Sequence, residues 1–152
     1  MARYVDRVMP LQGHYEPSPV DWVRQQVADF ESSNGQRGNT MRDLPIIVLT
    51  TKGARTGNLR KSPLMRVEHD GKYLIVASQG GAPKHPVWYH NTVANPTVEV
   101  QDGATRQDMS ARELSGEERE TWWQRAVDAF APYADYQQKT SRLIPILLCE
   151  PA

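Results

Sequence analysis

The spacing of its strand-like segments narrows the folds open to this chain more than any other feature. Residues 45–51, 59–68 and 73–78 are short runs that are rich in β-branched residues or alternate between apolar and polar ones. Only the turns at residues 52–57 and 69–71 separate them, whereas a parallel crossover needs a dozen or more residues. The three runs are therefore predicted to pair as an antiparallel meander.

A helix is predicted before this sheet. Ser18-Pro19 is typical of a helix start, with the serine as N-cap and the proline in the first turn. One apolar face of the helix would consist of Trp22, Val23, Val27 and Phe30. Residues 32–43 are polar, contain glycine and lack periodicity, which predicts a mobile connection or lid. We therefore divide the single structural domain into an N-terminal helix with a flexible connection, residues 1–44, and a sheet-bearing part, residues 45–152.

Helices and strands alternate in the rest of the chain. Residues 86–94 begin with proline and end before Asn95-Pro96, as a short helix does, and a hairpin over residues 97–111 turns at Asp102-Gly103. Ser115 and Glu118 have the spacing of a capping box. The helix that they open would have an apolar face of Trp122, Trp123, Ala126 and Phe130. A short helix near residues 133–140 and a buried strand over residues 143–149 follow. Five or six strands with two or three helices predict an α+β, mainly β, antiparallel barrel.

Charge is balanced over the whole chain but uneven along it. The 152 residues are 39% apolar and 24% charged, with 18 acids and 18 bases, which gives no general reason to expect a nucleic-acid partner. Residues 44–98, however, contain seven Lys or Arg against two Asp or Glu, and residues 99–135 contain nine acids against four bases. An anionic ligand would prefer the first of these regions.

Cellular location is indicated by cysteine content and by the absence of long apolar runs. Cys149 is the single cysteine, so no disulfide within the chain is possible, and we expect a reducing cytoplasm. The start of the chain lacks the pattern of a secretory signal, and no apolar run approaches the ~20 residues of a membrane span.

Two glycine-bearing turns and a pair of tyrosines are candidates for ligand contact. Residues 52–57 are typical of a turn that offers backbone N–H groups to a phosphate, or of a solvated hairpin. Residues 78–81 would allow close approach to a planar ligand, or would form a flexible joint. Tyr133 and Tyr136 are three residues apart and so project together from a helix, as proton donors or as the cap of a groove.

Hydrolytic and metal chemistry are not indicated. The four histidines, His14, His69, His85 and His90, lack the spacing of metal ligands. The sequence contains no GxSxG, HExxH, GxGxxG or GxxxxGK[ST] motif, so neither a nucleophile elbow nor a nucleotide-binding loop is predicted. We predict no metal site.

Six short motifs occur in order between residues 45 and 151. They are the turn at residues 50–57, Arg60 with Ser62-Pro63-Leu64, residues 77–81, residues 86–91 with 94–96, Tyr133-x-x-Tyr136-Gln137, and residues 142–146. Each motif alone is weak. The ordered set resembles the deazaflavin (F420)-dependent nitroreductase and F420H2-dependent quinone reductase family of actinobacteria.

The resemblance implies a split β-barrel of the flavin-binding, pyridoxamine-phosphate-oxidase-like type. It further implies coenzyme F420 as hydride donor and a quinone of the menaquinone type, or a nitroaromatic compound, as acceptor. The anionic phosphodiester and poly-γ-glutamate tail of F420 would contact Lys52, Ala54, Arg55, Thr56, Arg60 and Lys61. The ring system would be lined by Ser62, Pro63, Leu64, Met65, Val76, Ala77, Ser78 and Gln79, and closed by Val87, Trp88, Tyr89, His90, Asn91 and Tyr133. The catalytic set implied by the resemblance is Ser78, Tyr133 and Tyr136.

The chain also departs from some family members. Those members have tyrosine in place of Met65 and Phe130, and lysine in place of Gln79, so the acceptor pocket differs and a quinone is the expected acceptor. Two alternatives stay open, an FMN-binding split-barrel oxidoreductase and a non-catalytic deazaflavin carrier. The oligomeric state and a peripheral membrane contact through the Trp22 helix are also left open.

Overall fold

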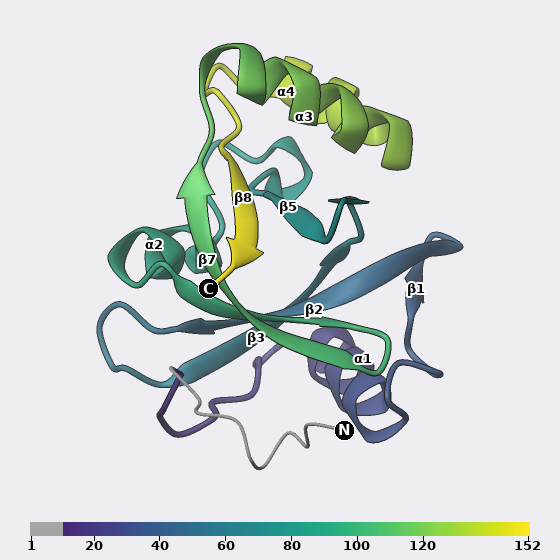
Figure 1. Cartoon of the computed structure of the whole chain (residues 1–152), viewed down its shortest axis with the longest axis vertical. Coiled ribbons are helices and arrows are strands. Elements are labelled where there is room, and N and C mark those ends of the chain that lie inside the picture. The colour runs from purple at the N-terminus through teal and green to yellow at the C-terminus, as the bar shows by residue number, and fades with distance from the viewer. Residues whose placement is uncertain (1–10) are drawn as a thin grey trace.

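One eight-stranded antiparallel sheet forms the centre of the computed structural model, which describes residues 11–152. The sheet runs in the order β1 (Thr40–Met41), β2 (Leu44–Lys52), β6 (Thr97–Asp102), β7 (Thr105–Glu113), β8 (Ile146–Pro151), β5 (Lys72–Val76) and β4 (Glu68–His69). β3 (Leu59–Met65) pairs with β2 outside this path. Figure 1 shows the sheet curling round on itself without closing. This mainly β, split-barrel architecture confirms the predicted fold class.

Four α-helices and a short 3-10 helix within residues 11–152 surround the sheet. α1 (Asp21–Ser32) packs against β3, and α2 (Val87–Ala94) packs against β2. α3 (Gly116–Ala129) and α4 (Pro132–Lys139) lie together above the other end of the curled sheet, as Figure 1 shows. α4 contacts the 3-10 helix η2 (Gln79–Gly81), which leads from β5 toward α2.

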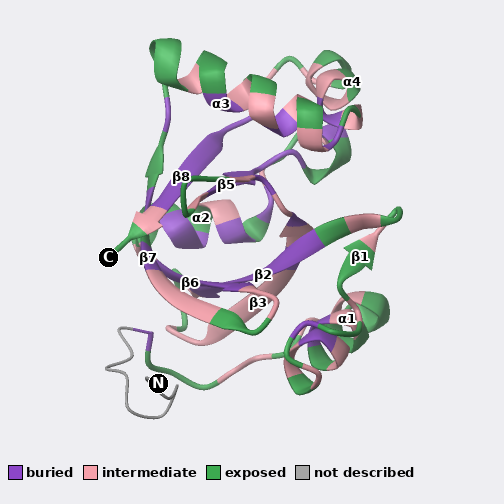
Figure 2. Ribbon diagram, turned by 45° about the vertical axis from the view of Figure 1, so that its right-hand side comes forward, coloured by how far each residue is buried: buried purple, intermediate pink, exposed green. Residues whose placement is uncertain are grey.

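The strand β2 is buried because both of its faces are covered. Ile46 and Val48 face a cluster that also holds Phe30 of α1, whereas Ile47 and Leu49 face a second cluster that holds Trp88 of α2. Continuous apolar runs of this kind are expected where both faces of a strand are packed. Figure 2 shows β2 mostly buried, whereas its partner β3 is mostly of intermediate burial. β3 therefore presents an accessible edge to the rest of the molecule.

The meander predicted over residues 45–78 is only partly correct. Residues 59–68 form two strands, and β5 pairs with β8 rather than with β3. The chain leaves β2 after β3. Arg66 N–H still donates to Pro45 O beside β2, but Val67 O already accepts from Leu74 N–H of β5. The β4–β5 hairpin does turn at residues 70–71, whose positive φ angles of 53° and 76° fit a two-residue loop with glycine second.

The N-terminal helix differs from its prediction at its start. α1 begins at Asp21 after Val20, and Ser18 Oγ accepts the N–H of Val20 instead of capping the helix. Val27 and Phe30 are buried as predicted, but Trp22 is 59% exposed, so its placement on the core face is wrong. The predicted loose connection contains strand β1, and Gln26 Nε2 donates to the carbonyls of residues 38 and 40. The division at residue 44 stays a prediction.

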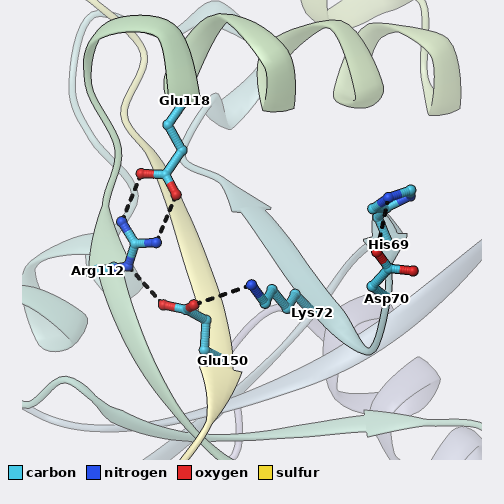
Figure 3. A network of polar contacts seen from close by, with 6 residues as sticks. All are labelled: His69, Asp70, Lys72, Arg112, Glu118 and Glu150. Carbon is cyan, nitrogen blue, oxygen red and sulfur yellow. Dashed lines mark hydrogen bonds and ion pairs between the residues drawn. The ribbon is translucent and has the colours of Figure 1, made fainter.

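A polar network holds α3 to the sheet, and it replaces the predicted capping box. Ser115 occupies the N-cap position of α3 without a side-chain cap bond, and Glu118 instead makes two hydrogen bonds of 2.7 and 2.8 Å with Arg112. Arg112 Nε also donates to Glu150, which lies 3.5 Å from Lys72 Nζ (Figure 3). The network joins α3, β7, β8 and β5 on an exposed surface.

Cys149 is buried in β8. Burial raises the pKa of the Cys149 thiol to about 12, so it is protonated at neutral pH.

Within residues 11–152, every helix is too short or too polar to cross a membrane.

Candidate functional site

A cavity of about 840 Å³ lies along β3 and is walled by segments that are distant in sequence. Such a volume suits a small-molecule or cofactor site. β3 contributes all of residues 60–65, because among the described residues its second edge is paired only at Leu59, which bridges to Tyr15. The remaining walls come from residues 16–19, α1, the end of β1 with the turn after it, the end of β5 with η2, α2, the C-cap of α3 and α4. Their lining side chains are Trp22, Val23, Met41, Arg42, Val76, Ser78, Gln79, Val87, Trp88, Asn91, Phe130, Tyr133 and Tyr136.

The glycine-bearing turn between β2 and β3 is held beside the cavity by α2. Ala54 N–H donates to Asn91 Oδ1 at 3.0 Å, and Asn95 Nδ2 donates to Lys52 O at 3.3 Å. Asn91 is buried and also lines the cavity. Arg55 is exposed in this turn and has no ion pair with another described residue, so its charge is available to an anion.

Two bases of β3 are instead paired with acids from the N-terminal segment. Arg60 lies 2.8 Å from Glu16, and Lys61 is ion-paired with Glu31 of α1. Both acids lie outside residues 44–98, so the net charge of that region alone overstates how basic the cavity is. The positive end of the cavity is therefore partly neutralised in the absence of ligand.

Arg142 holds the segment that connects β5 to α2. Its guanidinium donates to the carbonyl oxygens of Ser78 (2.8 Å), Ala82 (2.9 Å) and Ala77 (3.1 Å), and lies 2.9 Å from His85 Nδ1. Burial, together with the charge of Arg142, lowers the pKa of His85, which favours the neutral ring as hydrogen-bond acceptor. Arg142, the first residue of the motif at residues 142–146, thus holds a segment that lines the cavity.

A glycine allows α4 to approach this same segment. A Cβ atom at Gly81 would lie 2.7 Å from Tyr136 O, and the φ of Gly81 is +81°, a conformation that other residues avoid. The glycine thus lets α4 pack directly on η2. This packing brings Tyr133 and Tyr136 to the same cavity as Ser78.

Aromatic rings dominate the α4 end of the cavity. The centroids of Phe130 and Tyr133 are 4.9 Å apart, those of Tyr133 and Tyr136 are 6.2 Å apart, and the guanidinium of Arg42 lies 5.5 Å from the Phe130 centroid. Burial, and secondarily Tyr136, raises the pKa of Tyr133, so its hydroxyl is protonated at neutral pH. The hydroxyls of Ser78, Tyr133 and Tyr136 make no hydrogen bond with another described residue. Three donors are therefore free to bind a ligand.

Most of the predicted site residues line this cavity. Those that do are Arg60, Lys61, Ser62, Pro63, Leu64, Met65, Val76, Ser78, Gln79, Val87, Trp88, Asn91, Tyr133 and Tyr136. Lys52, Ala54, Arg55 and Thr56 lie in or at the start of the adjacent turn. The contacts of all these residues with a coenzyme stay predictions.

Three predicted ring-contact residues lie outside the cavity lining. Ala77 is fully buried, and the Tyr89 hydroxyl is directed away to Glu113, with which it makes a 2.6 Å hydrogen bond. That bond, with burial, raises the pKa of Tyr89 to about 12. His90 is exposed and packs against His85 and Tyr89.

Sequence reasoning missed the walls that precede β2. Glu16, Trp22 and Val23, together with Met41 of β1 and Arg42 of the turn after it, line the cavity although none of the six motifs includes them. No local signal set Trp22 apart, because with Val23 and Val27 it fits the apolar face of an ordinary amphipathic helix.

The cavity as a whole fits a ligand with a flat apolar part and an anionic part. Pro63, Leu64, Met65 and Val76 supply apolar surface, whereas Arg60 and Lys61, with Arg55 in the adjacent turn, supply positive charge. The two kinds of surface adjoin each other along β3.

Comparisons with known proteins agree with this description. A family model described as F420H(2)-dependent quinone reductase matches residues 22–151. An F420H(2)-dependent quinone reductase of Mycobacterium tuberculosis is 35% identical over 133 residues, which cover 85% of this chain and 89% of that protein.

Two solved structures resemble the fold and the sequence together. An F420-H2 dependent reductase is 61% identical, covers 70% of this chain and 94% of its own, and superposes with a TM-score of 0.67. A structure described as a domain-swapped dimer is 55% identical, covers 88% of this chain and 100% of its own, and has a TM-score of 0.70. The enzyme class and coenzyme F420 as cofactor, both expected from the motifs, are confirmed. The chain belongs to the F420H(2)-dependent quinone reductase family.

Proposed function

We propose that this protein transfers a hydride from reduced F420 to a quinone of the menaquinone type within the 840 Å³ cavity. The observation that carries the proposal is that one cavity joins a basic strand edge to three hydroxyl groups without hydrogen-bond partners among the described residues. The first suits the anionic coenzyme, and the second suits an acceptor that gains negative charge. We place this reaction in the cytoplasm, in keeping with the single, buried cysteine.

The coenzyme would be held by two kinds of contact. Pro63, Leu64 and Met65 offer an apolar surface to a flat ring, and Trp88 adds to it from α2. Arg60 and Lys61 line the same cavity, and Arg55 lies in the turn beside it, so that an anionic tail meets positive charge. When bound, reduced F420 supplies a hydride. The protein's own contribution is then mainly to hold an acceptor about 3–3.5 Å from the donor carbon.

The hydroxyls of Ser78, Tyr133 and Tyr136 would bind the acceptor oxygen. Tyr133 is protonated at neutral pH, because burial raises its pKa, and it can donate to an oxygen that becomes negative. Phe130 and Trp88 are mostly buried and line the same space, so they add apolar surface beside these hydroxyls. The protein thus orients the acceptor and stabilises its developing charge.

A quinone fits the acceptor region better than a nitroaromatic compound does. Met65 and Phe130 add no hydroxyl, and Gln79 adds no charge, so these three positions offer a nitro group fewer polar contacts than tyrosine and lysine would. Nitroaromatic compounds are the second class of acceptor to test. Trp22 and Val87 are 59% and 67% exposed and line the cavity, so we place any peripheral membrane contact at this rim.

The direct test is to mix the protein with reduced F420 under anaerobic conditions and to follow the return of oxidised F420 fluorescence. Menadione should accelerate this return more than a bicyclic nitroimidazole does, and no return is expected without acceptor. FMN should bind at least about tenfold more weakly than F420, a difference of about 1.4 kcal/mol. Tighter binding of FMN, or no response to menadione, contradicts the proposal.

A further inference from the structure

Two acids that precede the sheet in sequence, Glu16 and Glu31, form ion pairs with two bases that line the cavity. Glu16 Oε2 is 2.8 Å from Arg60 Nη2, and Glu31 of α1 is ion-paired with Lys61. Arg60 and Lys61 also line the cavity, so each base faces an internal carboxylate and the ligand space together. An incoming anion must therefore share Arg60 and Lys61 with these carboxylates, or displace the carboxylates from them.

The Glu31 pair is the stronger of the two, because it is shielded from solvent. The Lys61 and Glu31 side chains are 15% and 21% exposed, compared with 35% and 40% for Arg60 and Glu16. Arg106 lies 3.5 Å from Glu31 and 3.4 Å from the buried Glu99. Two bases, Lys61 and Arg106, thus lie among three acids, Glu31, Glu99 and Asp108, the last of which is opposite Glu99 in the β6–β7 ladder.

The position of Glu31 in its helix points the same way. Glu31 is in the last turn of α1, where no basic residue is present. The C-terminal end of a helix carries partial negative charge, so an acid there is unfavourable for the helix alone. Its contacts with Lys61 and Arg106 offset this cost, which indicates that the carboxylate serves the sheet rather than the helix.

We propose that Glu31, and more weakly Glu16, acts as an internal counter-anion that competes with the anionic tail of F420 for Lys61 and Arg60. These two acids thereby set the affinity for the coenzyme and its dependence on salt. The inference rests on the proposed function, since it assigns the tail of F420 to this edge of β3. Lys61 has three N–H donors, so binding weakens its contact with Glu31 without requiring that the contact break completely.

The test is a fluorescence titration of the whole protein with F420 at low and at high salt. Glu31→Gln keeps the shape of the side chain and removes its charge, and it should tighten F420 binding about three- to tenfold at low salt, with less gain at high salt. Glu16→Gln should also tighten binding measurably, but by less than about threefold, since its pair is more exposed. Glu117→Gln is the matched control, because Glu117 is exposed in α3 and far in the chain from β3.

A double variant separates competition from a general change in charge. If Glu31 acts through Lys61, adding Glu31→Gln to Lys61→Ala should change affinity by much less than it does in the parent protein. Unchanged or weaker binding by Glu31→Gln overturns the inference, and full additivity in the double variant does so as well. If Glu31→Gln does not fold in a thermal melt, Glu16→Gln takes its place, and unchanged binding by that variant overturns the inference.

Failure of the inference is distinguishable from failure of the proposed function. A parent protein that binds F420 and reduces menadione, with affinities unaltered by Glu31→Gln and Glu16→Gln, removes the counter-anion role alone. A parent protein that does not bind F420 removes both.

Discussion

The two ends of the cavity differ in the chemistry that they offer a ligand. The β3 end has charged side chains at intermediate exposure, and two of its bases are already matched by Glu16 and Glu31. The α4 end has a buried tyrosine, a neighbouring phenylalanine and hydroxyls that bond to no other described residue. Charges near solvent are screened and act equally on bound substrate and on the transition state, whereas a buried donor acts mainly where charge develops.

This difference predicts that the two ends control different measured quantities. Changes at the β3 end should alter the affinity for the coenzyme, and changes at the α4 end should alter the rate of hydride transfer at saturation. Substitutions at Arg142, Tyr133, Arg55 and Glu118 test this separation.

The largest effect is expected for the segment that connects β5 to α2, which contributes Ser78 and Gln79 to the cavity. Arg142→Met removes a guanidinium that donates to the carbonyls of Ala77, Ser78 and Ala82, and it should lower the free energy of unfolding by about 2–4 kcal/mol. Urea denaturation measures this loss. Arg142→Lys keeps the charge but can donate fewer hydrogen bonds. Its free energy of unfolding should therefore lie between those of the parent protein and of Arg142→Met. A loss below about 0.5 kcal/mol for Arg142→Met would show that the segment is held by other contacts.

At the α4 end, Tyr133→Phe should slow menadione reduction about 10- to 100-fold while F420 affinity stays near that of the parent. The loss corresponds to about 1.4–2.7 kcal/mol of transition-state stabilisation from one oriented donor. Only the hydroxyl is removed, so the packing of the ring against Phe130 is kept. Stopped-flow measurement of F420 oxidation at saturating coenzyme gives the rate, with Tyr136→Phe measured alongside. Equal rates in the parent, both single variants and the double variant would mean that solvent supplies the proton.

At the β3 end, Arg55→Ala should weaken F420 binding about three- to tenfold at low salt and leave turnover at saturating coenzyme close to that of the parent. Arg55 is exposed and has no ion pair with another described residue, so its removal breaks no internal contact of that kind. Fluorescence titration at two salt concentrations measures both the loss of affinity and the reduced dependence on salt. A collapse of turnover at saturation would instead place the reacting atoms next to this turn.

The smallest effect is expected far from both ends, in the network of Arg112, Glu118 and Glu150 (Figure 3). Hydrogen bonds from Arg112 lower the pKa of Glu118 and of Glu150 below the ordinary value of 4.5. Their stabilising contribution is therefore complete above about pH 5 and is lost as the pH falls through the lowered values, since the unfolded chain then binds more protons.

Glu118→Gln should accordingly flatten the acid side of the stability profile slightly, and it should alter neither F420 affinity nor turnover. Thermal melts at several pH values below 6 measure the first effect, and the titration and the stopped-flow assay measure the others. A change in affinity or rate would show that this exposed network is coupled to the cavity.

Many features of the fold, and the family, were predictable because they depend on residues that are close together in the chain. The turn at residues 70–71 requires two positive φ angles, and the residues Asp70 and Gly71 supply them. The order of motifs from residue 50 to residue 146 indicated the family, and with it the cofactor. The predicted helix face of α1 was right for Val27 and Phe30, whose period of three residues places both against the sheet.

Other features depend on contacts between segments that are far apart in the chain. Periodicity placed Trp22 with Val27, but α1 extends beyond the sheet at its start, so Trp22 lies at the cavity and not in the core. The capping box at Ser115 was not formed because Glu118 binds Arg112, which is also held by Glu150 of β8, 38 residues further along the chain.

Local pattern was therefore sufficient for the turns, most of the strands and the family of this protein, since steric and hydrogen-bonding preferences over a few residues specify them. The three-dimensional path of the chain was required for the pairing of β5 with β8, for the walls supplied by α1 and the β1–β2 turn, and for the neutralisation of Lys61 by Glu31. Coulomb energy depends on distance in space, and residues 31 and 61 are adjacent only because α1 folds back over β3. The charge that a coenzyme meets is thus a property of the folded molecule.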